Sequence, residues 1–213
     1  MAAQKVLVLG ATGGTGRALI VQAAAGGFSV TALVRHPQRL PPGIGDARII
    51  EGDILEEPDA LREALRGQDA VISALGVGQS LKSHALITRV APLLVDAMLE
   101  AGVRRLVFTS AFGVGSTRDD LPLLPRLFIA TVLRDIYEDK EAGEKAIAAS
   151  DLDWTLVCPV GLTNGGRTGR YRVGEHLPLS GFPRISRTDV ADCLLRQVQA
   201  TSFVRKRVLV APD

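Results

Sequence analysis

The stretch Val6-Leu-Val-Leu-Gly10-Ala-Thr-Gly13-Gly-Thr-Gly16-Arg17 decides the fold of this chain. A run of apolar β-formers ends at Gly10, two further glycines follow at three-residue steps, and a helix-compatible stretch comes next. This order predicts a strand, a tight turn and a helix N-terminus, whose free N–H groups and dipole favour a phosphate. The spacing is GxxGxxG instead of the commoner GxGxxG, and a glycine-rich turn without a ligand is the alternative. The residues expected to bind a dinucleotide here are Gly10, Thr12, Gly13, Gly14, Thr15, Gly16 and Arg17.

The composition is that of one large α/β domain. The chain has 213 residues, of which 46% are hydrophobic and 23% charged, with a formal net charge of +2. A charge so close to neutral gives no reason to expect a nucleic-acid or membrane partner. Cys158 and Cys193 lack metal or redox spacing, so we expect buried structural thiols and no metal site. Because no secretory segment is evident and the apolar stretch 121–132 is too short to span a bilayer, we expect a soluble cytoplasmic protein.

Buried-strand and helical patterns alternate along the chain. Strands are predicted at 5–9, 29–34, 47–50, 70–74, 105–109, 155–158 and 207–210. Helices are predicted at 14–25, 58–65, 83–101, 127–149 and 188–200, and Pro92 predicts a kink or a later start in the third. Nearly continuous apolar strands are typical of a parallel sheet covered on both faces. The alternation therefore predicts one α/β domain over 1–213, a Rossmann-type doubly wound parallel sheet in three layers.

One region breaks this alternation. Residues 161–187 are rich in glycine and arginine and contain only a short strand-like stretch at Tyr171-Arg-Val173. So long an irregular stretch in a compact domain is usually functional or disordered, and this one follows a strand, where ligand crevices of open sheets lie. We expect it on the substrate side. Its arginines, Arg167, Arg170 and Arg172, are candidates for holding an anionic group, and a solvated basic loop is the alternative.

Charged residues follow the second and third predicted strands. A dinucleotide fold meets the adenosine ribose at the end of the second strand, and Arg35 stands there in place of a carboxylate, with Arg39 nearby. A guanidinium pairs with a 2′-phosphate, so NADPH/NADP is expected in preference to NAD, unless Arg35 is a solvated strand-end residue. Asp53 follows the third strand, where it either accepts a hydrogen bond from the adenine, with Ile54 against the ring, or simply holds a turn.

Together these residues resemble the atypical short-chain dehydrogenase/reductases, and the resemblance covers nearly the whole chain. It continues in Phe108-Thr-Ser110-Ala-Phe112, in Asp153-Trp-Thr-Leu-Val-Cys-Pro159-Val-Gly-Leu162 and in Arg184-Ile-Ser-Arg-Thr-Asp-Val-Ala191. The nearest groups are the biliverdin reductase B, or flavin reductase, group and the NmrA-like proteins. The resemblance implies that the glycine loop, Arg35, Asp53 and the small residues after the fourth strand bind the cofactor. It also implies that Ser110 lies beside the nicotinamide. The remaining residues that it assigns to the cofactor are Ala74, Leu75, Gly76, Pro159, Val160, Gly161 and Leu162.

The catalytic pair of the family is incomplete in this chain. Many members place a tyrosine four residues before a lysine that lowers the pKa of the phenol for proton transfer. Lys140 is the candidate lysine, but Ile136 stands four residues before it. Tyr137 is three residues before it, on a different part of the helix surface, and is either a shifted acid or a structural tyrosine. The catalytic candidates are therefore Ser110, Lys140 and Tyr137.

These departures favour a hydride acceptor that needs no strong proton donor. A flavin, a quinone or a tetrapyrrole spreads the charge that it receives, so positioning and exclusion of water supply most of the acceleration. The sequence thus indicates an NADPH-dependent reductase of a small conjugated molecule, and the arginines of the 161–187 segment make an anionic molecule a candidate. A non-catalytic NADP(H) sensor or scaffold of the NmrA-like type, with a protein partner, is the alternative. A third reading, an NAD-dependent epimerase or dehydratase, is weakened by the missing tyrosine.

Overall fold

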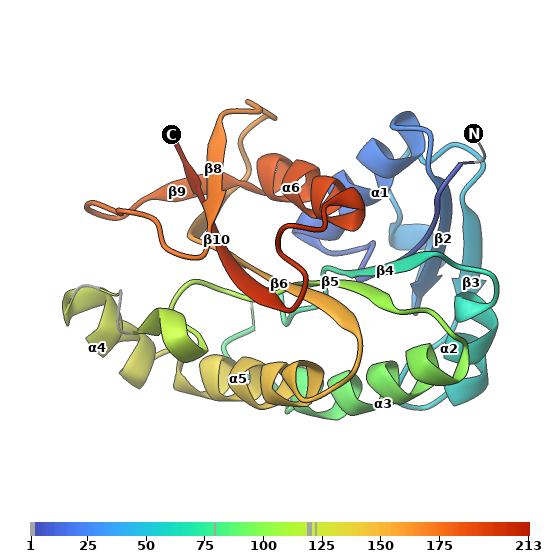
Figure 1. Ribbon diagram of the computed structural model, residues 1–213, viewed down its shortest axis with the longest axis horizontal. Helices are drawn as coiled ribbons and strands as arrows, with labels where there is room; N and C mark the ends of the chain where they lie inside the picture. The colour runs from blue at the N-terminus through green and yellow to red at the C-terminus, as the bar shows by residue number, and fades with distance from the viewer. Residues whose placement is uncertain (1–2, 79, 119–120, 122) are drawn as a thin grey trace.

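A single mixed sheet forms the centre of the computed structural model, which describes residues 3–78, 80–118, 121 and 123–213 (Figure 1). Within these residues the sheet has eight strands in the order β3-β2-β1-β4-β5-β6-β10-β8. Every neighbouring pair is parallel except β10 and β8, which are antiparallel. The strands are β1 (Lys5–Leu9), β2 (Ser29–Val34), β3 (Arg48–Glu51), β4 (Ala70–Ser73), β5 (Arg105–Thr109), β6 (Asp153–Pro159), β8 (Tyr171–Gly174) and β10 (Lys206–Pro212).

Helices cover both faces of this sheet. On one face lie α1 (Gly14–Ala25) and α6 (Arg187–Gln199); on the other lie α2 (Pro58–Leu65), α3 (Leu86–Glu100) and α5 (Arg134–Ala148) (Figure 1). Side chains alternate along each strand, so Val6 and Val8 belong to one hydrophobic core and Leu7 and Leu9 to the other. The predicted three-layer Rossmann-type fold is confirmed.

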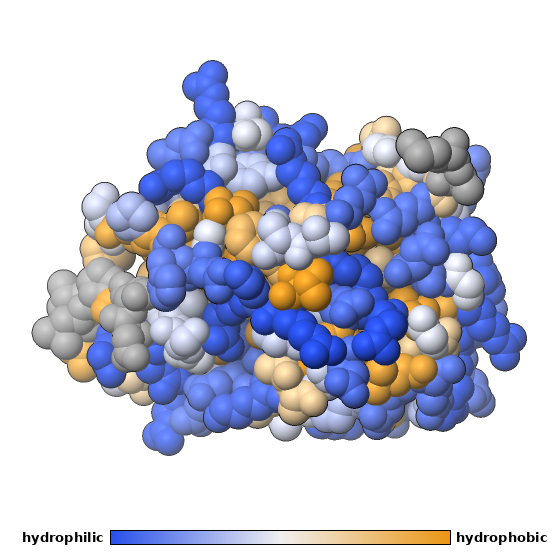
Figure 2. All heavy atoms as spheres, viewed as in Figure 1, coloured by the Kyte–Doolittle hydropathy of each residue, from blue (hydrophilic) through white to orange (hydrophobic). Residues whose placement is uncertain are grey.

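The outer surfaces of the helices follow from the same patterning. Figure 2 shows mostly hydrophilic residues along the edge where α3 and α5 lie. The apolar stripe of α3, with Ile87, Val90, Leu94 and Met98, is buried against the sheet. None of the described helices combines the length and the apolar character needed to cross a membrane.

The prediction of one helix over 127–149 is wrong. The structure has two helices, α4 (Leu123–Thr131) and α5, separated by Val132 and Leu133. The weak helix former Val132 stands at this break. A tertiary contact fixes the new start, because the Asp135 carboxylate in the first turn of α5 accepts a hydrogen bond from the backbone N–H of Ser83.

The third helix begins at Leu86, three residues after its predicted start at 83. His84 and Ala85 have φ angles of 52° and 51°, a left-handed conformation that ends any helix before it. The start of α3 is then capped from α5, since Asp139 accepts hydrogen bonds from the N–H groups of Ile87 (3.1 Å) and Thr88 (2.8 Å).

The segment after β6 is more regular than predicted. The strand-like stretch at 171–173 is confirmed as β8, which pairs with β10. Two further short strands, β7 (Gly161–Thr163) and β9 (Arg184–Ser186), pair in a separate parallel sheet. These strands leave connections at 164–170 and 175–183, and α6 begins directly after β9.

Helices α3 and α5 are in close contact at Gly143. A Cβ atom at this position would lie 2.4 Å from Cγ2 of Ile87 and 2.9 Å from its carbonyl oxygen. Because the second neighbour is backbone, it cannot move aside as a flexible side chain would. Only glycine therefore allows this spacing between the two helices.

Gly143→Ala is expected to lower the free energy of unfolding by about 1–3 kcal/mol, because the overpacked contact outweighs the gain in helix propensity. Urea unfolding of the purified protein measures this difference. Gly166→Ala is the control, since a Cβ at that position meets no atom within 4 Å. Equal effects of the two substitutions would show that the contact does not constrain the helices.

Candidate dinucleotide site

The glycine loop joins β1 to α1 through contacts that only glycine permits. Gly10 has a φ of 78°, and a Cβ there would lie 2.7 Å from the carbonyl oxygen of Ala74. A Cβ at Gly16 would lie 1.9 Å from the carbonyl oxygen of Gly10. The N–H of Gly13 donates to the same Gly10 oxygen at 2.9 Å and closes the turn. The loops that follow β1 and β4 therefore touch. This contact is compatible with the prediction that both loops bind one cofactor.

The N-terminus of α1 is open to a ligand. Its N-cap residue, Gly13, offers no side chain, and the first turn contains no acidic residue. Among the described residues, no acceptor is recorded for the N–H groups of Gly14, Thr15 and Gly16. Unpaired N–H groups at the positive end of a helix dipole form an anion site.

Arg35 and Asp53 come together at the ends of β2 and β3. Their side chains form an ion pair with 3.6 Å between Nη1 and Oδ2, at 66% and 28% exposure. Asp53 also holds a turn, because its Oδ1 accepts a hydrogen bond from the N–H of Leu55 at 2.8 Å. Ile54 is buried. Both readings of Asp53 are therefore compatible with its position: one carboxylate oxygen orders the loop and the other faces Arg35.

Arg17 and Arg39 are linked at the same end of the sheet. Nη1 of Arg17 donates to the carbonyl oxygen of Arg39 at 2.6 Å, which ties the first turn of α1 to the 3-10 turn Pro37–Arg39. Arg17, Arg35 and Arg39 are all exposed. The structure thus brings Arg17 to the segment that follows Arg35, near the position where the sequence places the 2′-phosphate.

Ser110 directly follows β5, and its hydroxyl is buried. Its N–H donates to the carbonyl oxygen of Val157 at 2.8 Å, and that of Phe112 donates to Pro159 at 2.9 Å. The side chain is buried near the Cys158 thiol, and its Oγ has no partner at normal hydrogen-bond distance among the described residues. The hydroxyl therefore does not cap the strand end, and a ligand at this edge of the sheet would satisfy it. Ala74, Leu75, Gly76, Val160, Gly161 and Leu162 follow the neighbouring strands β4 and β6.

Tyr137 and Lys140 do not form the usual catalytic pair. The hydroxyl of Tyr137 donates to the carbonyl oxygen of Phe112 at 3.1 Å, and Nζ of Lys140 donates to that of Thr109 at 3.4 Å. Burial raises the pKa of the Tyr137 phenol to about 12. Burial lowers the pKa of Lys140, and the nearby Glu144 carboxylate opposes this effect. A phenol that serves as a proton donor needs a lowered pKa, so the shift at Tyr137 has the opposite sign.

A buried ion pair that sequence reasoning missed lies beside Lys140. The Glu144 carboxylate, whose side chain is 1% exposed, accepts a hydrogen bond from the Arg207 guanidinium of β10. Arg207 also donates to Oγ of Ser116 at 2.8 Å. The sequence offers one signal, the position of Glu144 four residues after Lys140 on one helix face. Nothing local identifies Arg207 as the partner.

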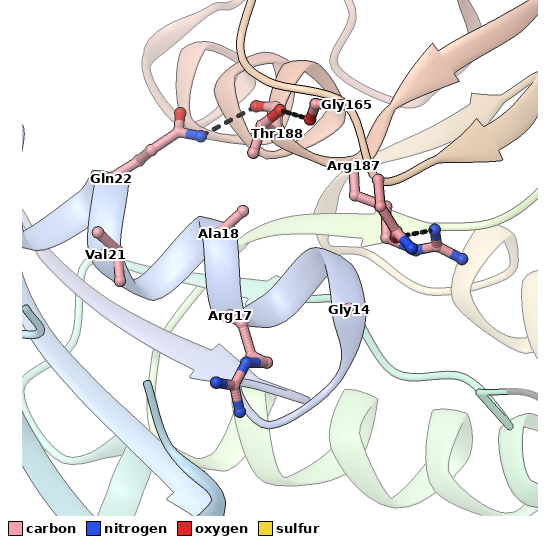
Figure 3. A pocket seen from close by; sticks show the side chains of 9 residues that line it. Gly14, Arg17, Ala18, Val21, Gln22, Gly165, Arg187 and Thr188 are labelled. Atoms are coloured by element: carbon pink, nitrogen blue, oxygen red, sulfur yellow. Dashed lines mark hydrogen bonds between the residues drawn. The ribbon is translucent and has the colours of Figure 1, made fainter. Parts of the chain in front are cut away.

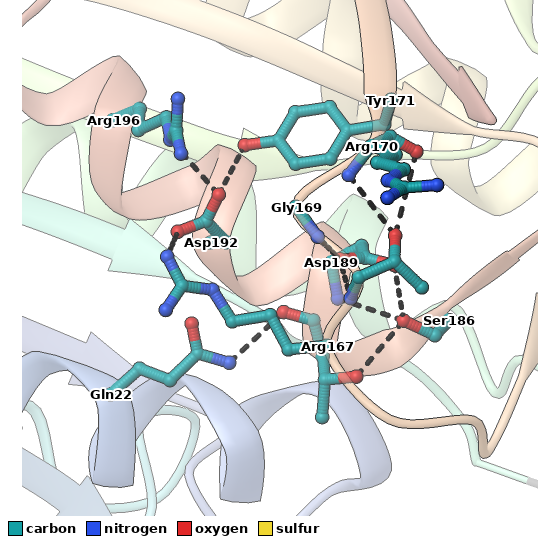
Figure 4. Close-up of polar contacts among 11 residues, drawn as sticks. Gln22, Arg167, Gly169, Arg170, Tyr171, Ser186, Asp189, Asp192 and Arg196 are labelled. Carbon is teal, nitrogen blue, oxygen red and sulfur yellow. Dashed lines mark hydrogen bonds and ion pairs between the residues drawn. The ribbon is translucent and has the colours of Figure 1, made fainter. Parts of the chain in front are cut away.

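The loop at 165–172 is fastened to α6 by buried carboxylates (Figure 4). Asp192 accepts hydrogen bonds from the side chains of Arg167 and Tyr171 and pairs with Arg196 at 2.9 Å. Arg172 donates to the carbonyl oxygen of Pro212 at 3.4 Å. Arg167 and Arg172 thus bind the protein itself, whereas Arg170 is exposed, and a role of these arginines in holding an anionic ligand stays a prediction.

Asp189 completes this attachment. Asp189 lies three residues after Ser186, the N-cap of α6. The backbone N–H of Asp189 donates to Oγ of Ser186 at 3.0 Å, and the Ser186 hydroxyl donates to the Asp189 carboxylate at 2.8 Å. The same carboxylate accepts the N–H groups of Thr168 and Gly169, each at 2.8 Å. The Ser-x-x-Asp spacing is a readable helix-start signal, but its second use, in holding the loop, depends on tertiary structure.

Comparison with known proteins agrees with this geometry. The chain belongs to the NAD(P)H-binding family, which matches residues 10–201. It is 32% identical over 174 residues to an uncharacterized chloroplastic protein of Arabidopsis thaliana, covering 78% of this chain and 62% of that protein. It is 30% identical over 216 residues to the photosystem II assembly factor Ycf39 of Synechocystis, covering 95% of this chain and 60% of that protein. The chain thus spans about three fifths of the length of these two relatives.

Solved structures share the fold over nearly the whole chain. The oxidoreductase ylbE of Lactococcus lactis has a TM-score of 0.82 at 21% identity, covering 99% of this chain and 91% of that one. The anaerobillin reductase ChuY of Escherichia coli O157:H7 has a TM-score of 0.79 at 22% identity, covering 97% and 96%. The chain is thus a member of the NAD(P)H-binding family, and it shares its fold with these two solved structures.

Both tyrosines of the chain are expected to ionise well above the ordinary pKa of about 10. Burial raises the pKa of Tyr137 to about 12 and also raises that of Tyr171, which donates to Asp192. The ultraviolet absorbance of tyrosinate should therefore stay low at pH 10 in the folded protein and appear on unfolding. Because the unfolded phenols ionise first, stability should fall as the pH rises from about 10 to about 12. Ionisation of one tyrosine below pH 9 would contradict this assignment.

Proposed function

We propose that this chain is an NADPH-dependent reductase that transfers hydride to a small conjugated acceptor such as a flavin, a quinone or a tetrapyrrole. The observation that carries the proposal is the state of Tyr137, whose hydroxyl is bound to the Phe112 carbonyl and whose pKa is raised to about 12. Reduction of an isolated carbonyl needs a tuned proton donor at this place. A conjugated ring needs much less, because it delocalises the charge that it receives.

The residues present fit a nicotinamide dinucleotide. The loop around Gly10 and Gly16 has the bare backbone that closely packed phosphates need, and the first turn of α1 offers unpaired N–H groups. Arg35 is placed for the 2′-phosphate and Asp53 for the adenine amino group. Bound NADPH supplies the hydride. The unpartnered hydroxyl of Ser110 is positioned to donate one hydrogen bond at the reacting end.

Three large apolar side chains on the connections and helices that follow strands of the sheet are exposed. Leu81 is 60% exposed, Leu127 is 53% exposed and Phe182 is 72% exposed. They lie on segments that follow β4, β5 and β8, and the first two of these strands end at the candidate site. The fold is also shared with ChuY, an anaerobillin reductase of Escherichia coli. If these side chains line the site, they would suit a flat, largely apolar molecule better than a sugar.

Turnover tests the proposal directly. Purified protein should oxidise NADPH in the presence of FMN, riboflavin or a quinone. Tyr137→Phe should keep the rate within about threefold, because the phenol gives no proton, whereas Ser110→Ala should lower kcat by about tenfold through loss of one hydrogen bond. Tight binding of NADPH without turnover of any of these acceptors would contradict the proposal. A loss of more than a hundredfold in Tyr137→Phe would restore Tyr137 as the acid.

Arg35→Ala should weaken NADPH binding by about tenfold, because a charge-assisted hydrogen bond to the 2′-phosphate is lost. NADH binding should change less than twofold, since NADH carries no phosphate there. Fluorescence titration with each nucleotide measures both constants. Arg66→Ala at the C-cap of α2, also an exposed arginine, is the matched control. Equal losses of affinity for NADPH and NADH would show that Arg35 does not bind the 2′-phosphate.

A second candidate is an NADP(H)-binding sensor or scaffold without catalytic turnover. The relative that favours it is the assembly factor Ycf39, whose name describes assembly instead of catalysis. The incomplete Tyr/Lys pair suits this candidate as well. A protein partner whose affinity differs between the NADP⁺-bound and NADPH-bound forms, together with absent turnover, would favour it over the reductase.

A further inference from the structure

A groove between α1 and the start of α6 carries arginines but no acidic side chain. Its volume is about 500 Å³. Figure 3 shows Arg187 beside Gly14 and Arg17 projecting from the same turn of α1. The lining residues are Gly14, Arg17, Ala18, Val21, Gln22, Asn164, Gly165, Arg187 and Thr188.

Arg187, the first residue of α6, packs directly on the glycine loop. Its Cδ and Nε atoms lie 2.8 Å from the position that a Cβ of Gly14 would occupy. Its Nη1 donates to Oδ1 of Asn164 at 2.6 Å. Among the described residues, no carboxylate lies within 4.0 Å of its guanidinium. The side chain is therefore held in place by a neutral partner and keeps its charge uncompensated.

Two arginines of neighbouring segments differ from Arg187 in this respect, whereas Arg17, in the same groove, also has no carboxylate partner among the described residues. Arg167 is paired with Asp192, and Arg207 with the buried Glu144. Arg187 instead stands beside the positive end of the α1 dipole, where the N–H groups of Gly14, Thr15 and Gly16 have no recorded acceptor. Two positive groups placed together without a counter-charge repel each other, and an anion between them removes this cost.

We propose that Arg187 is a second clamp on the diphosphate of the dinucleotide, opposite the N–H groups of α1. The ligand is the cofactor of the proposed function, but the role of Arg187 does not depend on which acceptor is reduced. The diphosphate is favoured over the 2′-phosphate because Arg187 lies on Gly14, at the start of α1, whereas Arg35 lies at the end of β2 beside Asp53.

The clamp also connects the cofactor to the substrate-side segment. Asn164, which orients Arg187, follows β7, and Thr188 Oγ1 donates to the carbonyl oxygen of Gly165 at 2.8 Å. Gln22 of α1 donates to the carbonyl oxygen of Thr188 at 2.9 Å. A bound diphosphate would thus hold α1, the start of α6 and the 164–165 connection together.

Nucleotide fragments separate the two phosphate sites. Arg187→Gln keeps most of the side-chain length and removes the charge. It should therefore weaken the binding of NADPH and of NADH by the same factor, about ten- to thirtyfold. Binding of 2′-AMP, which has the 2′-phosphate and no diphosphate, should change less than twofold. Arg187→Lys should recover part of the loss. Arg184→Ala, an exposed arginine on the neighbouring β9, is the control and should bind all three ligands as the parent protein does.

Two results would overturn the proposal. If Arg187→Gln weakens NADPH but not NADH, Arg187 serves the 2′-phosphate; if neither nucleotide is weakened, the groove does not face the cofactor. Thermal unfolding without nucleotide checks that each variant is folded. If either Arg187→Gln or Arg187→Lys is unstable, the comparison of NADPH, NADH and 2′-AMP is made with the other variant. Because the readout is binding, absence of acceptor turnover would contradict the proposed reductase and leave the result for Arg187 standing.

Discussion

The contact between Gly16 and the carbonyl oxygen of Gly10 is the constraint on which the rest of the site depends. A Cβ at Gly16 would lie 1.9 Å from that oxygen, so α1 starts directly against the turn that ends β1. The unpaired N–H groups of its first turn therefore lie at the carboxyl edge of the sheet, next to the Ala74 loop. Any larger residue at either glycine would displace the helix and separate its dipole from this edge.

Buried charge sets the chemistry available at the other end of the site. An unpaired carboxylate at Glu144 would be very costly, and Arg207 neutralises it. Lys140 lies close enough for Glu144 to support its protonated form, but burial outweighs this support. The lysine contacts a backbone carbonyl and forms no hydrogen bond with the phenol among the described contacts. The pair that would lower the pKa of a tyrosine is therefore replaced by an ion pair that stabilises β10 against α5.

Sequence predicted the position of the candidate site better than its contacts. Gly10, Arg35, Asp53 and Ser110 each follow a parallel strand, and the carboxyl ends of such strands meet at one edge, so local pattern suffices to gather them. The predicted fold is confirmed, and it too could be predicted locally, because the hydrophobic pattern of each segment indicates a buried strand or an amphipathic helix. The nucleotide-binding roles of these residues stay predictions.

What failed depends on contacts between distant segments. The break between α4 and α5 is fixed by Asp135 binding Ser83, and periodicity carries no sign of a hydrogen bond that spans so many residues. The contacts of two arginines also depend on distant segments. Arg167 donates a hydrogen bond to Asp192 of α6, and Arg187 contacts Gly14 only because α6 packs on α1. Arginine identity alone does not distinguish the paired side chain from the uncompensated one.

The one-residue offset of Tyr137 is a fixed property of the fold. Each residue along a helix turns the side chain by about 100°, so moving the tyrosine from position 136 to 137 redirects it to the Phe112 carbonyl. A rotation of α5 could restore the usual direction, but two contacts with α3 prevent it. Gly143 is packed on Ile87, and Asp139 caps the N-terminus of α3. Since α5 cannot turn without breaking both contacts, the phenol stays bound to the Phe112 carbonyl. This position agrees with the proposed hydride acceptor, which stabilises its own charge.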